Sequence, residues 1–126
     1  MKLRLIAAIV LLAASVGLSI FFVARLNSRT RELTSALESA MAATAAQPEE
    51  WASATQEALR LWERDDDFLH ILLPHVNLNE LEWALGSLEE YQRQGDKELY
   101  TEHCVRALQC LKTVREMERP NWGNVF

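Results

Sequence analysis

Helix-breaking residues are scarce in this chain. Its 126 residues include four glycines and three prolines, and few β-branched residues lie outside an apolar N-terminal run. Sandwiches and barrels need glycine and proline at many turns and β-branched side chains in their strands. The composition therefore argues against an all-β fold and favours an all-α chain.

Cysteine is also scarce. The two cysteines, Cys104 and Cys110, lie six residues apart on one predicted helix. Six helical residues advance the chain by about 9 Å, beyond the Cα separation of about 7 Å that a disulfide allows. The two thiols are therefore not expected to pair. We expect Cys104 in the core and Cys110 partly exposed, where an extracytoplasmic thiol could instead cross-link two protomers.

Sequence signatures of catalysis are missing. The chain contains no G-x-S-x-G nucleophile motif and no glycine-rich phosphate loop. Its histidines, His70, His75 and His103, show none of the short ligand spacings that are typical of zinc sites. The alternative is a metal site assembled across helices from His75, Glu80 and His103. No catalytic residue, cofactor or metal is otherwise predicted.

One acidic run resembles a cation-binding segment at first sight. Asp65, Asp66 and Asp67 are consecutive, but the alternating oxygen ligands and the glycine of a calcium loop are absent. Successive helical residues point about 100° apart, so three adjacent carboxylates cannot converge on one ion. The run is predicted to be a solvated charge cluster.

Acidic residues are absent from the first 31 residues, which carry five of the 13 basic residues. Residues 32–126 contain all 18 acidic side chains and eight basic ones, which gives this part of the chain a net charge of −10. A phosphate backbone repels such a surface. Nucleic-acid binding is therefore not expected.

The chain does contain one long apolar run. Leu5 to Ala24 are twenty consecutive residues without a charge, and basic residues flank the run on both sides. As a helix the run is about 30 Å long, which matches the hydrocarbon thickness of a bilayer. We predict a membrane anchor over residues 1–26, with the lipid bilayer as its partner through residues 5–24, and an acidic helical domain over 27–126.

A cleaved signal peptide is the alternative interpretation of this run. The apolar region of a signal peptide usually has about 7–15 residues and precedes a small-x-small cleavage site. Here the run is longer, and small-x-small triplets such as Ala13-Ala14-Ser15 lie inside it. An uncleaved anchor is favoured, and we expect a cytoplasmic N-terminus with the soluble domain outside the cytoplasm, although basic residues on both flanks do not fix the orientation.

Four helical segments are predicted. The anchor helix continues without a breaker to about Ala46, and a second helix begins at Pro48 and ends before Pro74. A third helix spans residues 78–94, with Asn77 as its N-cap. Gly95 and Asp96 then form a short joint to a fourth helix over residues 97–118.

These segments carry apolar stripes at helical spacing. The stripe positions are Leu33, Leu37, Ala40, Met41 and Thr44; Trp51, Thr55, Ala58, Trp62, Asp65, Leu69 and Leu72; Leu78, Leu81, Leu85 and Leu88; and Tyr100, Cys104, Ala107, Leu108, Leu111 and Val114. The short joint at Gly95 makes the last two helices antiparallel neighbours. The predicted fold is all-α: a transmembrane helix followed by a small antiparallel bundle of three to four helices, with the apolar tail 121–126 folded back onto it.

Trp83 falls between the stripe positions Leu81 and Leu85 and is expected to point away from the core of its own helix. An outward tryptophan tends to mark a partner surface. With Glu82, Glu89 and Glu90 it forms the candidate partner surface of the domain. The alternative is that the first helix of the domain covers Trp83.

The order of landmarks resembles domain-of-unknown-function family 4363. The landmarks are the apolar anchor, Trp51 and Trp62, the segment His75-Val76-Asn77-Leu78-Asn79-Glu80-Leu81-Glu82, Leu88 and Tyr91, and the ending Asn124-Val125-Phe126. The resemblance covers essentially the full chain. It implies a small bacterial single-pass membrane protein with a helical soluble part, and it implies no activity.

The sequence therefore favours a membrane-anchored interaction or assembly module without catalytic activity. Its expected partner is a membrane protein or a second copy of the chain. Two alternatives stay open: an enzyme or metal-binding protein with a site between helices, and a secreted helical domain that is released by signal cleavage.

Overall fold

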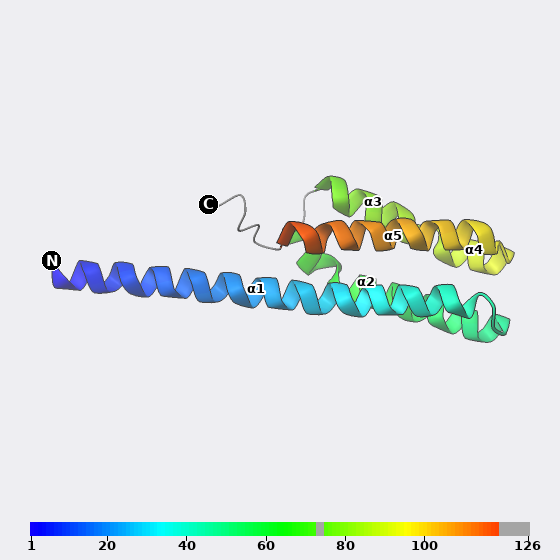
Figure 1. The fold of residues 1–126 in the computed structure, drawn as a ribbon, viewed down its shortest axis with the longest axis horizontal. Helices are drawn as coiled ribbons and strands as arrows, with labels where there is room; N and C mark the ends of the chain where they lie inside the picture. The colour runs from blue at the N-terminus through cyan, green and yellow to red at the C-terminus, as the bar shows by residue number, and fades with distance from the viewer. Residues whose placement is uncertain (73–74, 119–126) are drawn as a thin grey trace.

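The computed structural model describes residues 1–72 and 75–118, with side chains placed for residues 1–71 and 78–116. The described residues form α-helices and contain no strand (Figure 1). The helices are α1 (Lys2–Ala43), α2 (Pro48–Leu72), α3 (His75–Gly86), α4 (Leu88–Gln94) and α5 (Lys97–Glu118). The predicted all-α class is confirmed. The predicted packing of the tail 121–126 lies outside the described residues.

Helix α1 joins the apolar run to the bundle without interruption, as predicted. Its N-terminal half extends beyond the other helices, and α2 to α5 lie beside its C-terminal half (Figure 1). Every side chain from Met1 to Phe21 is exposed, and Leu26 is the first buried residue. The helix ends at Ala43, close to the predicted Ala46, where the Thr44 hydroxyl donates to the Met41 carbonyl (2.8 Å).

Helix α2 returns along the C-terminal half of α1 (Figure 1). It begins at Pro48, and Glu49 and Glu50 occupy its first turn. A proline at the first helical position loses no hydrogen bond, and the two carboxylates complement the positive end of the helix dipole. The predicted restart at Pro48 is confirmed.

The third predicted helix differs from the structure at its start and in its middle. Helix α3 already begins at His75, so Asn77 is not its N-cap. A side chain that can cap a helix can also stand inside its first turn, so the asparagine alone did not determine the first helical residue. Ser87, with φ −101° and ψ −3°, separates α3 from α4. Gly86 and Ser87 are both weaker helix formers than alanine, which explains a break at this pair.

The joint between α4 and α5 follows the prediction. Gly95 adopts φ 72°, the Asp96 backbone N–H donates to the Tyr91 carbonyl (3.0 Å), and the Asp96 carboxylate accepts from the Leu99 N–H (3.1 Å). The left-handed glycine closes α4, and the aspartate caps α5. Helix α5 runs antiparallel to α3 and α4 and packs against both, as well as against α1 (Figure 1).

Every helix of the bundle contributes side chains to the core. Its larger cluster contains Leu33, Leu37, Ala40, Trp51, Ala58, Leu61, Leu81, Ala84, Leu85, Leu88, Tyr100, Cys104, Ala107, Cys110 and Leu111. A smaller cluster of Leu26, Leu69, Leu78 and Val114 lies next to it. Because Leu26 belongs to this cluster, the helix that carries the apolar run also forms one wall of the bundle.

Candidate functional site

The structure places Trp83 on the surface of α3, with 53% of its area exposed. One face of the indole lies against the His103 ring, at 4.6 Å between centroids, and Arg106 approaches it at 5.1 Å. Both residues belong to α5. The structure therefore corrects the alternative interpretation, because α5 and not the first helix of the domain covers the inner half of this side chain.

The His103 ring packs against the inner side of Trp83. Its imidazole is buried, and Nδ1 forms a hydrogen bond with the Ala84 carbonyl (3.1 Å). The edge of the Tyr91 ring packs on the same imidazole at 4.9 Å. These contacts give His103 Nδ1 a hydrogen-bond partner inside the bundle and pack the imidazole between Trp83 and Tyr91.

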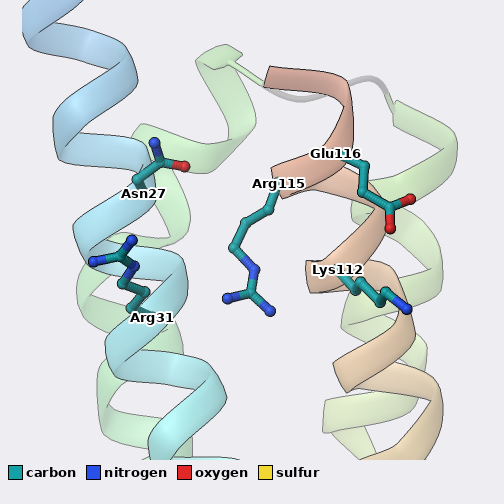
Figure 2. A pocket seen from close by; sticks show the side chains of 5 residues that line it. All are labelled: Asn27, Arg31, Lys112, Arg115 and Glu116. Carbon is teal, nitrogen blue, oxygen red and sulfur yellow. The ribbon is translucent and has the colours of Figure 1, made fainter. Parts of the chain in front are cut away.

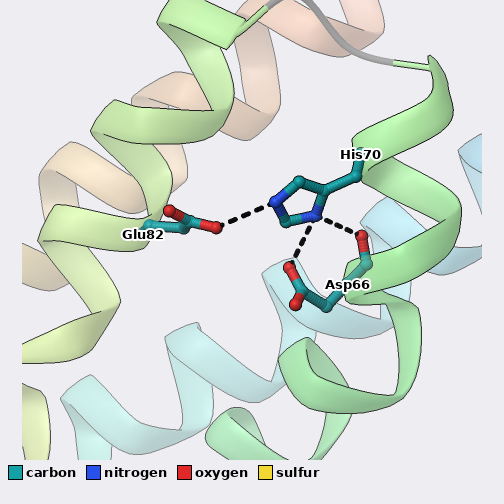
Figure 3. A group of neighbouring side chains, drawn as sticks. All are labelled: Asp66, His70 and Glu82. Carbon is teal, nitrogen blue, oxygen red and sulfur yellow. Dashed lines mark hydrogen bonds and ion pairs between the residues drawn. The ribbon is translucent and has the colours of Figure 1, made fainter.

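Glu82 takes part in a bridge between α2 and α3. Its carboxylate lies 3.1 Å from His70 Nε2, and His70 Nδ1 lies 2.9 Å from Asp66 Oδ1 and 2.7 Å from the Asp66 carbonyl (Figure 3). The hydrogen bond to the Asp66 carbonyl and the nearby carboxylates raise the pKa of His70 above its usual range. The imidazole side chain ties two helices together on the surface of the bundle.

Asp66, His70 and Glu82 bring ligand-type atoms within 4.8 Å of one another. The two carboxylates approach different ring nitrogens, so they lie on opposite sides of the imidazole (Figure 3). One ion can bind only one of these nitrogens. The geometry therefore fits a protonated imidazole between two carboxylates better than a three-ligand metal centre.

The metal site suggested from His75, Glu80 and His103 does not assemble from the side chains that the structure describes. His103 faces the Ala84 carbonyl, whereas the exposed Glu80 carboxylate lies near the Cys110 thiol and contributes to the raised pKa of that thiol. The His75 side chain lies outside the described set. Of the suggested ligands, the two that can be compared have separate partners.

Glu89 and Glu90 both interact with Arg93 within α4. The Arg93 guanidinium lies 2.6 Å from the Glu89 carboxylate and 3.7 Å from that of Glu90. The hydrogen bond from Arg93 lowers the pKa of Glu89. Of the four residues in the candidate partner surface, Trp83 therefore faces α5, Glu82 faces His70, and the other two form a small ion cluster of their own.

Both cysteines are free and buried, so the predicted partial exposure of Cys110 is wrong. Only 8% of the area of Cys110 is accessible. Burial raises the pKa of Cys104 to about 12 and that of Cys110 to about 11. Cys104 is fully buried and Cys110 nearly so, and both pKa values are raised, so neither thiol is placed for the suggested cross-link between protomers.

Asp65 corrects the interpretation of the aspartate run as a solvated cluster. Its side chain is buried, lies 3.4 Å from Arg29 of α1, and accepts a hydrogen bond from Arg64 Nε at 3.0 Å. Arg64 also binds Glu32 of α1 at 2.6 Å. Asp65 occupies a stripe position of α2, and this periodicity was the signal that it faces inward.

Sequence reasoning missed a cavity of about 280 Å³ between α1 and α5. Asn27 and Arg31 of α1 and Lys112, Arg115 and Glu116 of α5 line it (Figure 2). Its two walls lie about 80 residues apart in the chain, so no local pattern links them. Basic residues outnumber acidic ones here, although the bundle as a whole is acidic.

Comparison with known proteins supports the resemblance seen in the sequence. A family described as Domain of unknown function (DUF4363) matches residues 20–125. No curated protein and no solved structure matches the chain. The match begins within α1 and includes all of α2 to α5, which is more than half of the chain. The chain therefore belongs to this family.

Proposed function

We propose that this protein is a membrane-anchored interaction module that acts through protein contacts and without catalysis. The observation that carries the proposal is the N-terminal half of α1. Its apolar window has a mean hydropathy of 2.7, and none of it is buried inside the molecule. Such a surface is unfavourable in water, and a bilayer would cover it.

The continuity of α1 supports an uncleaved anchor over a signal peptide. Leu26 packs in the core of the bundle only two residues after the apolar run ends at Ala24. Cleavage at a small-x-small triplet inside the run would leave exposed apolar residues such as Ile20 and Phe21 at the new terminus. We propose a cytoplasmic N-terminus and an extracytoplasmic bundle.

The surface around Trp83 supports a function in contact. The indole is half covered by α5 and packs on the His103 ring, so Trp83 would lose less side-chain entropy on binding a partner than a fully free side chain would. Trp is also enriched among residues that dominate binding energy. The proposed partner is a protein in the same membrane.

Photo-cross-linking in membranes tests this proposal. A photoactivatable phenylalanine derivative at position 83 should give a discrete adduct in cells, while the same group at Gln109, an exposed position on α5, should give none. Mass spectrometry of the adduct distinguishes another membrane protein from a second copy of the chain. Equal adducts at both positions, or none at either, would contradict a contact surface at Trp83.

The same membranes test the anchor. The chain should resist alkaline carbonate extraction and keep the mass of residues 1–126, and protease outside right-side-out vesicles should digest the bundle. A shortened chain in the soluble fraction would establish the secreted alternative. Full protection from protease until lysis would reverse the orientation.

A further inference from the structure

The cavity between α1 and α5 concentrates positive charge in an otherwise acidic bundle. Arg115 extends into the space between the two helices, and the Asn27 amide points toward the same space (Figure 2). The Arg31 guanidinium lies across α1 and is turned away from Arg115, and the charged ends of Lys112 and Glu116 extend from α5 away from α1 (Figure 2). Three basic residues and one acidic residue give the lining a net charge of +2.

The basic residues of the cavity differ from most other arginines in the described part of the chain, which are paired with carboxylates. Arg29, Arg60, Arg64 and Arg93 each form an ion pair with a carboxylate. Arg31, Lys112 and Arg115 form no ion pair with any side chain that the structure describes. An anionic ligand would supply the missing countercharge.

The cavity lies directly beyond the apolar run. Asn27 and Arg31 follow Ala24 by three and seven residues, which places them about 4.5 and 10.5 Å further along the helix axis. The headgroup layer of a bilayer extends about 5–8 Å beyond the hydrocarbon core. Side chains on a helix lean toward its N-terminus, so Arg31 leans back toward this layer.

We infer that this cavity binds the phosphate of an anionic phospholipid headgroup. The inference rests on the membrane anchoring proposed above. Arg115 can donate two hydrogen bonds to phosphate oxygens, Asn27 can add an amide donor, and Arg31 adds positive charge beside the cavity. Lys112 contributes a further positive charge at the rim.

The size of the cavity agrees with this ligand. Its volume of about 280 Å³ falls just below the range of about 300–1,000 Å³ that is typical of small-molecule pockets. A headgroup phosphate fits such a space, whereas a helix of a partner protein does not. Phosphate from solution has the same chemistry, so the test must separate the two sources.

The test uses the full chain in an uncharged detergent. It is titrated with short-chain phosphatidylglycerol, with phosphatidylcholine of the same chain length, and with inorganic phosphate. Arg115→Gln removes one charge from the cavity, and Arg25→Gln removes one charge near the bilayer but outside the cavity. If Arg115→Gln fails to fold by circular dichroism, Lys112→Gln replaces it, because Lys112 is exposed.

Phosphatidylglycerol should bind more tightly than phosphatidylcholine. Its dissociation constant should rise about tenfold in Arg115→Gln, the effect of losing one charge-assisted hydrogen bond, and by less than about twofold in Arg25→Gln. Arg115→Lys keeps the charge but not the paired donors and should lie between the two.

Other outcomes would overturn the inference. Equal losses in Arg115→Gln and Arg25→Gln would mean general surface charge and no site. Inorganic phosphate that binds through Arg115, without preference for phosphatidylglycerol, would exclude the lipid source. A chain that integrates into membranes but shows no lipid selectivity refutes this inference alone, whereas a chain extracted by carbonate refutes the anchor.

Discussion

Asp65 shows how one residue links α1, the helix that carries the apolar run, to the rest of the bundle. It is buried on α2 and faces Arg29 of α1, while Arg64 beside it reaches Glu32 of α1. A buried carboxylate is stable only where cations or donors compensate its lost hydration. The α1–α2 interface is therefore partly ionic, with a specific register.

Replacing Asp65 with Asn should destabilise the fold by about 1–3 kcal/mol, because the two arginines lose their shared buried partner. This loss of stability is smaller than for a fully buried ion pair, because the side chains of Arg29 and Arg64 are 23% and 34% exposed. Thermal unfolding of the full chain in detergent measures the effect. Asp67→Asn, at an exposed position in the same run, is the control and should change stability by less than about 0.5 kcal/mol.

At the scale of elements, two glycines end helices for different reasons. Gly95 has φ 72°, a conformation that favours glycine, and it closes α4. Gly86 ends α3 without a positive φ, and a Cβ added there would meet no atom within 4 Å. The backbone therefore requires glycine at the first position and not at the second.

Alanine substitutions at the two glycines should have opposite signs. Gly95→Ala should cost roughly 1–2 kcal/mol, because a side chain disfavours the left-handed conformation. Gly86→Ala should stabilise the fold by about 0.5–1 kcal/mol, because it reduces the freedom of the unfolded chain and improves helix propensity. Urea unfolding of the full chain in detergent measures both, and two changes of the same sign would contradict these roles.

For the whole molecule, the central feature is that α1 has two environments. Its N-terminal half is apolar and entirely exposed, and its C-terminal half forms a wall of the bundle. Leu26 marks the transition, since it packs with Leu69, Leu78 and Val114. The apolar segment is therefore connected to the bundle through a packed helix, with no linker between them.

Leu26→Ala tests this connection. It should destabilise the bundle by about 2–5 kcal/mol through the cavity it creates among three helices. Tryptophan fluorescence during urea unfolding does not report on the apolar half of α1, because all four tryptophans follow residue 50. Leu12→Ala, at an exposed position in the apolar half, should leave this transition unchanged. Equal effects of the two substitutions would mean that the bundle does not depend on the packing of Leu26.

The sequence alone determined the local features of this protein. Helical periodicity, the proline at position 48 and the glycine–aspartate pair at 95–96 predicted most of the element boundaries, and the length of the apolar run predicted an anchor. These signals act over a few residues, because caps, propensities and helix faces depend on near neighbours in the chain. The break at Ser87 was missed because two weak helix formers only sometimes interrupt a helix.

Tertiary structure decided which residues meet across helices. It buried Asp65 against Arg29, covered half of Trp83 with α5, buried Cys110, and opened the basic cavity between α1 and α5. The partners in these contacts lie from about 20 to nearly 90 residues apart in the chain. Helical spacing shows which face of a helix turns inward. Only the packing of the helices determines which side chains of other helices contact that face.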